Sequence, residues 1–196
     1  MDHLISLFIV WFSVINPLFT QEIIAIPDRQ EAKAAFEYLN RIRQDPAQYK
    51  DSIGEFMGST DPAAELQWND TLAELAEKRA LDMAKRKYFD HVTPEGKGIN
   101  IMLTEAGYKL DPDWIKDISS NSFESIYAGA KSCKEAIYAL IIDDNVPGKG
   151  HRKHLLGMTE WYGMLRDIGI GYVKCDRDSG ARYISYTCII IAIHGW

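Results

Sequence analysis

The sequence predicts a three-layer α-β-α sandwich of the α+β class. Apolar residues recur at helical spacing through most of the chain before residue 160, and strand-like segments follow in the C-terminal part. The last of these segments, from Cys188 to Ile193, is apolar at every position. Such a strand has to be covered on both faces, so we expect helices on each side of the sheet.

Composition narrows the functional classes. A chain of 196 residues fits one domain, and its 46% hydrophobic and 26% charged residues are typical of a soluble globular protein. The net charge of −6 and the shortness of the basic clusters at 85–87 and 152–153 argue against nucleic acid as a partner. The chain contains no Gly-x-Ser-x-Gly, Walker or His-Glu-x-x-His motif and no dinucleotide-binding glycine pattern.

The N-terminal segment has the pattern of a signal peptide. Leu4–Phe19 is an apolar run broken by Pro17 and followed by polar residues around Gln21, although the basic residues that usually precede such a run are missing. A membrane span is the alternative, but the run is short for one. We therefore expect residues 1–21 to be removed, leaving one domain over residues 22–196. The mature chain should have no stable membrane span and a secreted or periplasmic location.

The first helix of the mature chain is predicted over Asp28–Gln44. Asp28 and Glu31 supply its N-terminal cap, and Asp45-Pro46 ends it. Its buried face consists of Ala32, Ala35, Phe36, Leu39 and Ile42.

A second amphipathic helix begins near residue 70, where Asn69, Asp70 and the Thr71–Glu74 capping box compete as its start. Its apolar stripe comprises Leu72, Leu75, Ala76, Ala80, Met83, Ala84 and Tyr88. Arg79 and Lys87 are charged residues at positions of this stripe, and we expect their stems to lie along apolar surface with the charge in water. The helix should deliver Tyr88 and Phe89 into a core and hold His91 just past its end.

Four shorter segments follow before the strands. Ile99–Ala106 is predicted as a helical turn, and we assign the polar segment Leu110–Ser122 at most one short strand. Ser132–Ile142 is predicted as a helix because it opens with a capping box and carries one apolar face. Pro147–Gly150 breaks that helix, and His151–Leu156 begins another helical turn.

Asp167–Cys175 and Ala181–Ile193 are predicted as two strands of a hairpin. A turn centred on Ser179 sets Cys175 opposite Tyr183 and Cys188 opposite Ile170. The three cysteines do not make a disulfide framework, and a bridge between Cys175 and Cys188 would require a longer loop. Cys133, at the start of a helix, should behave as a small buried hydrophobe.

Histidines and carboxylates stand at the ends of several predicted elements. They are His91, Glu124, Asp143 or Asp144, and His151. Two histidines with one or two acids can form a metal site with open positions or a general acid–base pair. A local alternative pairs His151 with His154, three residues apart on one helical face. Each residue could instead only cap or hydrogen-bond, and spacing alone favours that interpretation.

Several phrases occur in a characteristic order: LNRIRQDPAQY, LQWNDTLAELAEKRALDMAKRKYFDH, FESIYAG, DDNVPGKGHRKHLL and DIGIGYV. In this order they resemble the CAP superfamily of extracellular domains, which includes cysteine-rich secretory proteins, antigen-five allergens, plant pathogenesis-related proteins and bacterial SCP-like domains. The resemblance runs from about residue 30 to the C-terminus. It implies an α-β-α sandwich, in agreement with the fold predicted from the residues.

The resemblance also implies a cavity that carries two histidines and two acids. His91 matches the first histidine, Glu124 the glutamate, and His151 the second histidine. The second acid falls on Asp143, which we prefer, although helical phase would turn Asp144 the same way. The chain departs from the family pattern at Phe123 and Ser125, at His154, and through extra residues between His91 and Glu124 (including Trp114) and around residues 161–163. These departures affect the entrance of the cavity.

The resemblance therefore implies a secreted, non-enzymatic binding module. Its cavity would hold zinc or another divalent metal through His91 and His151, with Glu124 and Asp143 as supporting carboxylates, and would take a lipid or peptide. The first alternative is a hydrolase that uses Glu124 and His151. Because the sequence offers no nucleophile with an oriented base, such a hydrolase would depend on activated water. The second alternative is a structural surface protein.

Overall fold

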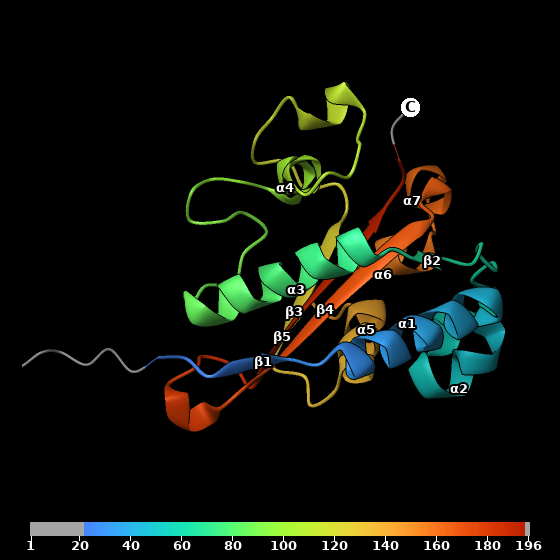
Figure 1. Ribbon diagram of the computed structural model, residues 1–196. Coiled ribbons are helices and arrows are strands. Elements are labelled where there is room, and N and C mark those ends of the chain that lie inside the picture. The colour runs from blue at the N-terminus through green and yellow to red at the C-terminus, as the bar shows by residue number, and fades with distance from the viewer. Residues whose placement is uncertain (1–21, 195–196) are drawn as a thin grey trace, which may run out of the picture.

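In the computed structural model, which describes residues 22–194, a five-stranded open sheet lies between layers of helices (Figure 1). The strands are β1 (Ala25–Pro27), β2 (Gln67–Trp68), β3 (Glu124–Ala128), β4 (Asp167–Cys175) and β5 (Ser185–Ala192). Their order is β1-β4-β5-β3 with antiparallel neighbours, and β2 adds a short parallel pairing to β4. This confirms the predicted α-β-α sandwich. The predicted signal peptide lies outside the described residues.

The helices are α1 (Arg29–Gln44), α2 (Lys50–Ile53), α3 (Asp70–Lys85), α4 (Ile99–Glu105), α5 (Cys133–Ile142), α6 (Gly150–Leu156) and α7 (Glu160–Met164). Short 3₁₀ helices cover Pro46–Tyr49, Glu55–Ser59, Pro112–Ile115 and Arg177–Ser179. Helix α3 covers one face of the sheet, and α1 and α5 cover the other (Figure 1). Within residues 22–194, no helix combines the length and apolar character that crossing a membrane requires.

The helix starts follow the predicted capping residues. The Asp28 side chain accepts from the Glu31 amide at 3.0 Å, and the Ser132 hydroxyl accepts from the Glu135 amide at 3.2 Å. Of the three competing caps before α3, Asn69 is the one used, since its side chain accepts from the amide of Leu72. These local bonds set where the covering helices begin.

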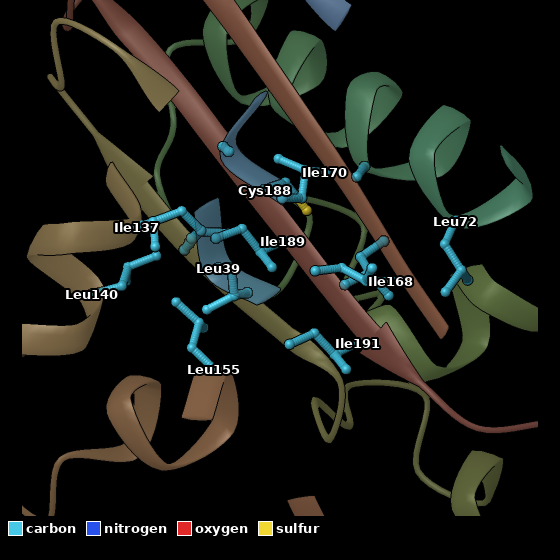
Figure 2. Close-up of a cluster of buried hydrophobic side chains, with 14 of the residues drawn as sticks. Leu39, Leu72, Ile137, Leu140, Leu155, Ile168, Ile170, Cys188, Ile189 and Ile191 are labelled. Atoms are coloured by element: carbon cyan, nitrogen blue, oxygen red, sulfur yellow. The ribbon is translucent and has the colours of Figure 1, made fainter. Parts of the chain in front are cut away.

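The two faces of the sheet are packed differently. On one face, Leu39, Ile137, Leu140 and Leu155 pack over Ile189 and Ile191 (Figure 2). On the other face α3 lies against the backbone of β4, because Gly169 and Gly171 have no side chains there. A Cβ atom built on Gly169 would lie 2.1 Å from the carbonyl carbon of Leu72. This close approach fixes the depth of α3, which carries residues of the site described below.

The β4–β5 hairpin corrects the predicted register by one residue. Cys188 pairs with Gly171 instead of Ile170, and the Cys175 amide donates to Ile184 instead of facing Tyr183. The reason is the connection, where a 3₁₀ helix is followed by Gly180 in the left-handed region, with φ of +79°. This centres the loop between residues 179 and 180. The three cysteines are free, and Cys133 is buried as expected.

One open assignment is decided by the structure, and one further expectation was wrong. Residues 110–122 contain a 3₁₀ helix and no strand, because Asp111 caps the 3₁₀ helix and the Asn100 side chain donates to the Trp114 carbonyl at 2.7 Å. Phe89 is exposed instead of entering the core, since the chain turns at Lys87, where φ is +58°. Its ring lies at the margin of the sheet, 5.9 Å from that of Tyr183.

Replacing Gly169 with alanine should destabilise the protein by about 1–3 kcal/mol or more, because the new methyl group has to push α3 away from β4. Urea unfolding would measure the loss. Gly150→Ala is the matched control, since a Cβ there has no atom within 4 Å and the backbone angle is ordinary. Equal stability of the two variants would contradict the close packing of α3.

Candidate functional site

The candidate site lies at the start of the edge strand β3. Side chains alternate between the two faces of a sheet, and the pairing of β3 with β5 gives their directions. Glu124 pairs with Ile190 and shares a face with Gly169, which α3 covers. Ser125 therefore points to the opposite face, toward α5 and α6. The first residues of β3 thus reach both helical layers.

Glu124 is fully buried and holds His91 from the α3 side. One carboxylate oxygen, Oε2, lies 2.9 Å from Nδ1 of His91. The other, Oε1, accepts from Nε of Arg79 at 3.0 Å and from the thiol of Cys188 at 3.4 Å. The side chains of Arg79 and Glu124 are both 0% exposed, so this is a buried ion pair. Both oxygens of Glu124 are therefore engaged.

Arg79 corrects the sequence interpretation, which put its charge in water. Its guanidinium also donates to the Tyr88 hydroxyl and to the carbonyl of Asp90, the residue before His91. Burial opposes its charge and is the largest single influence, but Glu124, Cys188 and Tyr88 together outweigh it, and the pKa of Arg79 is raised. Arg79 lies on the buried face of α3, so its charged side chain points into the core, where Glu124 meets it. It fixes both Glu124 and the segment that carries His91.

Asp143 holds His151 from the other layer. Its Oδ1 lies 2.7 Å from Nδ1 of His151, and its Oδ2 accepts from the backbone amides of His151 and Arg152 at 3.0 and 3.3 Å. Asp143 caps the C-terminal end of α5, just after Ile142, and adopts the left-handed conformation, which turns its buried carboxylate toward the start of α6. Asp144 is exposed, and the carboxylate that His151 bonds is that of Asp143.

The two histidines face each other. Their ring centroids are 6.2 Å apart and the ring planes are within 28° of parallel. Each ring uses Nδ1 to bond a buried carboxylate, which in the neutral imidazole places the proton on Nδ1 and the lone pair on Nε2. Both rings line a cavity of 220 Å³. Within residues 22–194, no three His, Cys, Asp or Glu side chains are grouped to hold a metal ion.

His154 lines the same cavity from a buried position. Its Nδ1 lies 2.8 Å from the hydroxyl of Ser125, and Nε2 has no hydrogen-bond partner among the described residues. Burial lowers the pKa of His154 to about 3, so the ring is neutral near pH 7. Ser125 and His154 are two of the positions that depart from the family pattern. The structure joins these two departures in one hydrogen bond.

Only some residues of the two extra segments, between His91 and Glu124 and around residues 161–163, line the cavity. Trp114 and Trp161 pack edge to face, with centroids 5.1 Å apart, and lie outside the cavity lining. The residues of these segments that do line it include Asn121 and Tyr162. Asn121 also bonds the amide and the carbonyl of Glu124 at 3.0 and 3.3 Å. Sequence reasoning missed Asn121, since its only signal is a short polar residue just before a strand.

Comparisons with known proteins bear on the fold and the family. The family model described as "Cysteine-rich secretory protein family" (CAP) matches residues 36–190. An outer surface protein of Borrelia burgdorferi superposes with a TM-score of 0.57 at 14% identity, over 88% of this chain and 99% of that one. An extracellular SCP-domain protein of Bacillus anthracis has a TM-score of 0.53 at 18% identity, over 85% of this chain and 41% of that one. A comparison with curated proteins found no match.

Replacing Arg79 with methionine should cost about 3–5 kcal/mol of unfolding free energy, because it leaves the Glu124 carboxylate buried without its cation. Urea unfolding would measure this. The double variant Arg79→Met/Glu124→Gln should recover part of the loss, since a neutral amide is cheaper to bury than an unpaired charge. Strictly additive losses would contradict the coupling of these two residues.

Proposed function

The chain belongs to the cysteine-rich secretory protein (CAP) family, and we propose that it is an exported binding domain in which His91 and His151 hold a divalent metal ion beside a ligand cavity. The observation that carries the proposal is the duplicated pairing of a histidine Nδ1 with a buried carboxylate, on rings that face each other. Metal-binding histidines usually have such a carboxylate behind them.

The donor set suits zinc or a similar ion held weakly. Two neutral imidazole nitrogens are good zinc ligands, and the bonds to Glu124 and Asp143 would orient the rings and raise their basicity. A zinc ion bound there would supply a positive charge and open coordination positions to a ligand. Because two protein ligands are fewer than the usual three or four, we expect reversible binding.

Export is supported by two independent features. The apolar segment Leu4–Phe19 with its polar end has the pattern of a signal peptide. The structural relatives at the outer surface of Borrelia burgdorferi and in the extracellular protein of Bacillus anthracis share the fold. An exported domain of this kind would meet a lipid or a peptide at the cavity.

The hydrogen bonds of Glu124 and the burial of Cys188 favour a binding role over hydrolysis. Both oxygens of Glu124 are occupied by Arg79, Cys188 and His91, so this carboxylate is poorly placed to take a proton from water. The Cys188 thiol is buried, and burial raises its pKa well above the usual value, so it is not a thiolate nucleophile.

Calorimetry with zinc should detect one site that both His91→Ala and His151→Ala abolish. Glu124→Gln and Asp143→Asn should weaken it by about 10–100-fold, because they remove the groups that orient the rings. His194→Ala is the control, since that exposed histidine bonds Asp167 outside the cavity. Binding that survives His91→Ala but is lost in His154→Ala would favour the local His151–His154 pair instead.

Purified, zinc-loaded protein should leave a broad panel of peptide and ester substrates uncut, because the site lacks an activated nucleophile and a donor set for a developing oxyanion. Chromatographic detection of products would check this. Turnover that disappears in both Glu124→Gln and His151→Ala, in protein free of contaminating protease, would favour the hydrolase.

A further inference from the structure

A second, larger groove adjoins the histidine cavity. It has a volume of 630 Å³ and is lined by strand β3 and helix α5. Tyr183 lies near Gly129, just past the end of β3, and therefore marks one end of the groove. Asp143 and His151 mark the other end, since His151 faces His91 and His91 bonds Glu124 at the start of β3. The groove thus follows the length of the edge strand toward the histidine pair.

The outer edge of β3 carries unpaired backbone groups along this groove. The Gly129 amide donates to Ser185 and the Ile191 amide donates to Phe123, so the odd-numbered residues of β3 direct their backbone groups at β5. Ile126 and Ala128 therefore direct theirs outward. Among residues 22–194, no hydrogen bond reaches these outward N–H and C=O groups.

At Glu124, the first residue of β3, the outer edge of the strand is covered by a side chain. The outward amide and carbonyl of Glu124 are both bonded by the side chain of Asn121. An exposed strand edge is a template for pairing, and proteins usually cover it. Here the Asn121 side chain covers only the backbone groups of Glu124, beside the histidine cavity. The outward N–H and C=O groups of Ile126 and Ala128, which line the groove, have no such cover.

We propose that this groove binds an extended peptide segment of a partner protein, which adds to the sheet as a strand alongside β3. An added strand would pair its main chain with the outward groups of Ile126 and Ala128, and its alternate side chains would enter the groove. A lipid chain could fill the apolar space but would leave these backbone groups unpaired. The inference rests on the proposed binding role and not on the metal.

The charge of the groove indicates the peptide's composition. Glu135 and Asp144 line it with exposed side chains, and neither makes an ion pair with a residue in the described part of the chain. The apolar lining includes Tyr127, Tyr138 and Phe89. Basic side chains alternating with aromatic or β-branched ones would match both features.

The test starts with a phage-displayed library of random linear dodecapeptides selected on the purified protein. Peptides with alternating apolar and basic residues should be enriched. One selected peptide is then synthesised with a single N-methyl group at each successive position, and its affinity is measured by fluorescence anisotropy. Binding should fall about tenfold or more at alternate positions and little at those between, because only every second residue of an added strand bonds the edge.

Variants of the protein give a second measurement. Ala128→Pro removes an outward N–H without removing a bond to β5, and should weaken binding about tenfold relative to Ala128→Ser. Asp144→Lys should weaken it more than Glu65→Lys, an equal charge change at an exposed residue away from the groove. Thermal unfolding checks that each variant is folded, and the N-methyl series needs no variant.

Several outcomes would overturn the proposal. They are failure to enrich any peptide, an N-methyl series without a period of two, and displacement of the selected peptide by a dansylated fatty acid whose own binding is unchanged in Ala128→Pro. The last result would make the groove a lipid site. Zinc calorimetry on the unmodified protein separates the two hypotheses, since peptide binding by a protein that binds no zinc refutes only the metal site. Peptide binding should also persist with EDTA and in His91→Ala, because the strand edge does not depend on the metal.

Discussion

The buried ion pair between Arg79 and Glu124 is the interaction on which the site depends. It joins α3 to the edge strand β3, and the same guanidinium holds the Asp90 carbonyl next to His91. A buried ion pair adds little net stability, but losing one partner is costly. The chain therefore cannot move α3, β3 or the His91 segment independently. The glycines of β4, which let α3 approach the sheet, set the distance that this pair spans.

The site repeats one arrangement from both layers of the sandwich. Glu124 orients His91 on the α3 side, and Asp143 orients His151 at the junction of α5 and α6. Each carboxylate is buried and hydrogen-bonds Nδ1 of its histidine. The two Nε2 atoms are therefore the ring nitrogens that can contact a ligand. The edge position of β3 makes this possible, because residues of both helical layers can meet around the open edge of a sheet.

The same edge accounts for the neighbouring groove. Asn121 closes the backbone of β3 at Glu124, where the carboxylate has to stay fixed, and the rest of the strand stays open to the groove. Rigid polar bonding and an open strand edge are thus adjacent on one short strand. The proposed recognition of a peptide depends on this division of roles along β3.

Sequence reasoning was sufficient for the main helices and for the two long strands, because each depends on residues a few positions apart, but it did not predict the short strands β1, β2 and β3. Periodicity and caps predicted α1, α3 and α5 closely, as in Asp28 and Ser132, and the motif resemblance identified His91, Glu124, Asp143 and His151. Only the tertiary structure decided that Arg79 is buried, that Ser125 bonds His154, and that the hairpin register is shifted by one residue. Arg79 and Glu124 are 45 residues apart, and Ser125 and His154 are 29 apart. A charged residue is buried or exposed according to the partner that another element supplies, and periodicity along one helix contains no information about that partner.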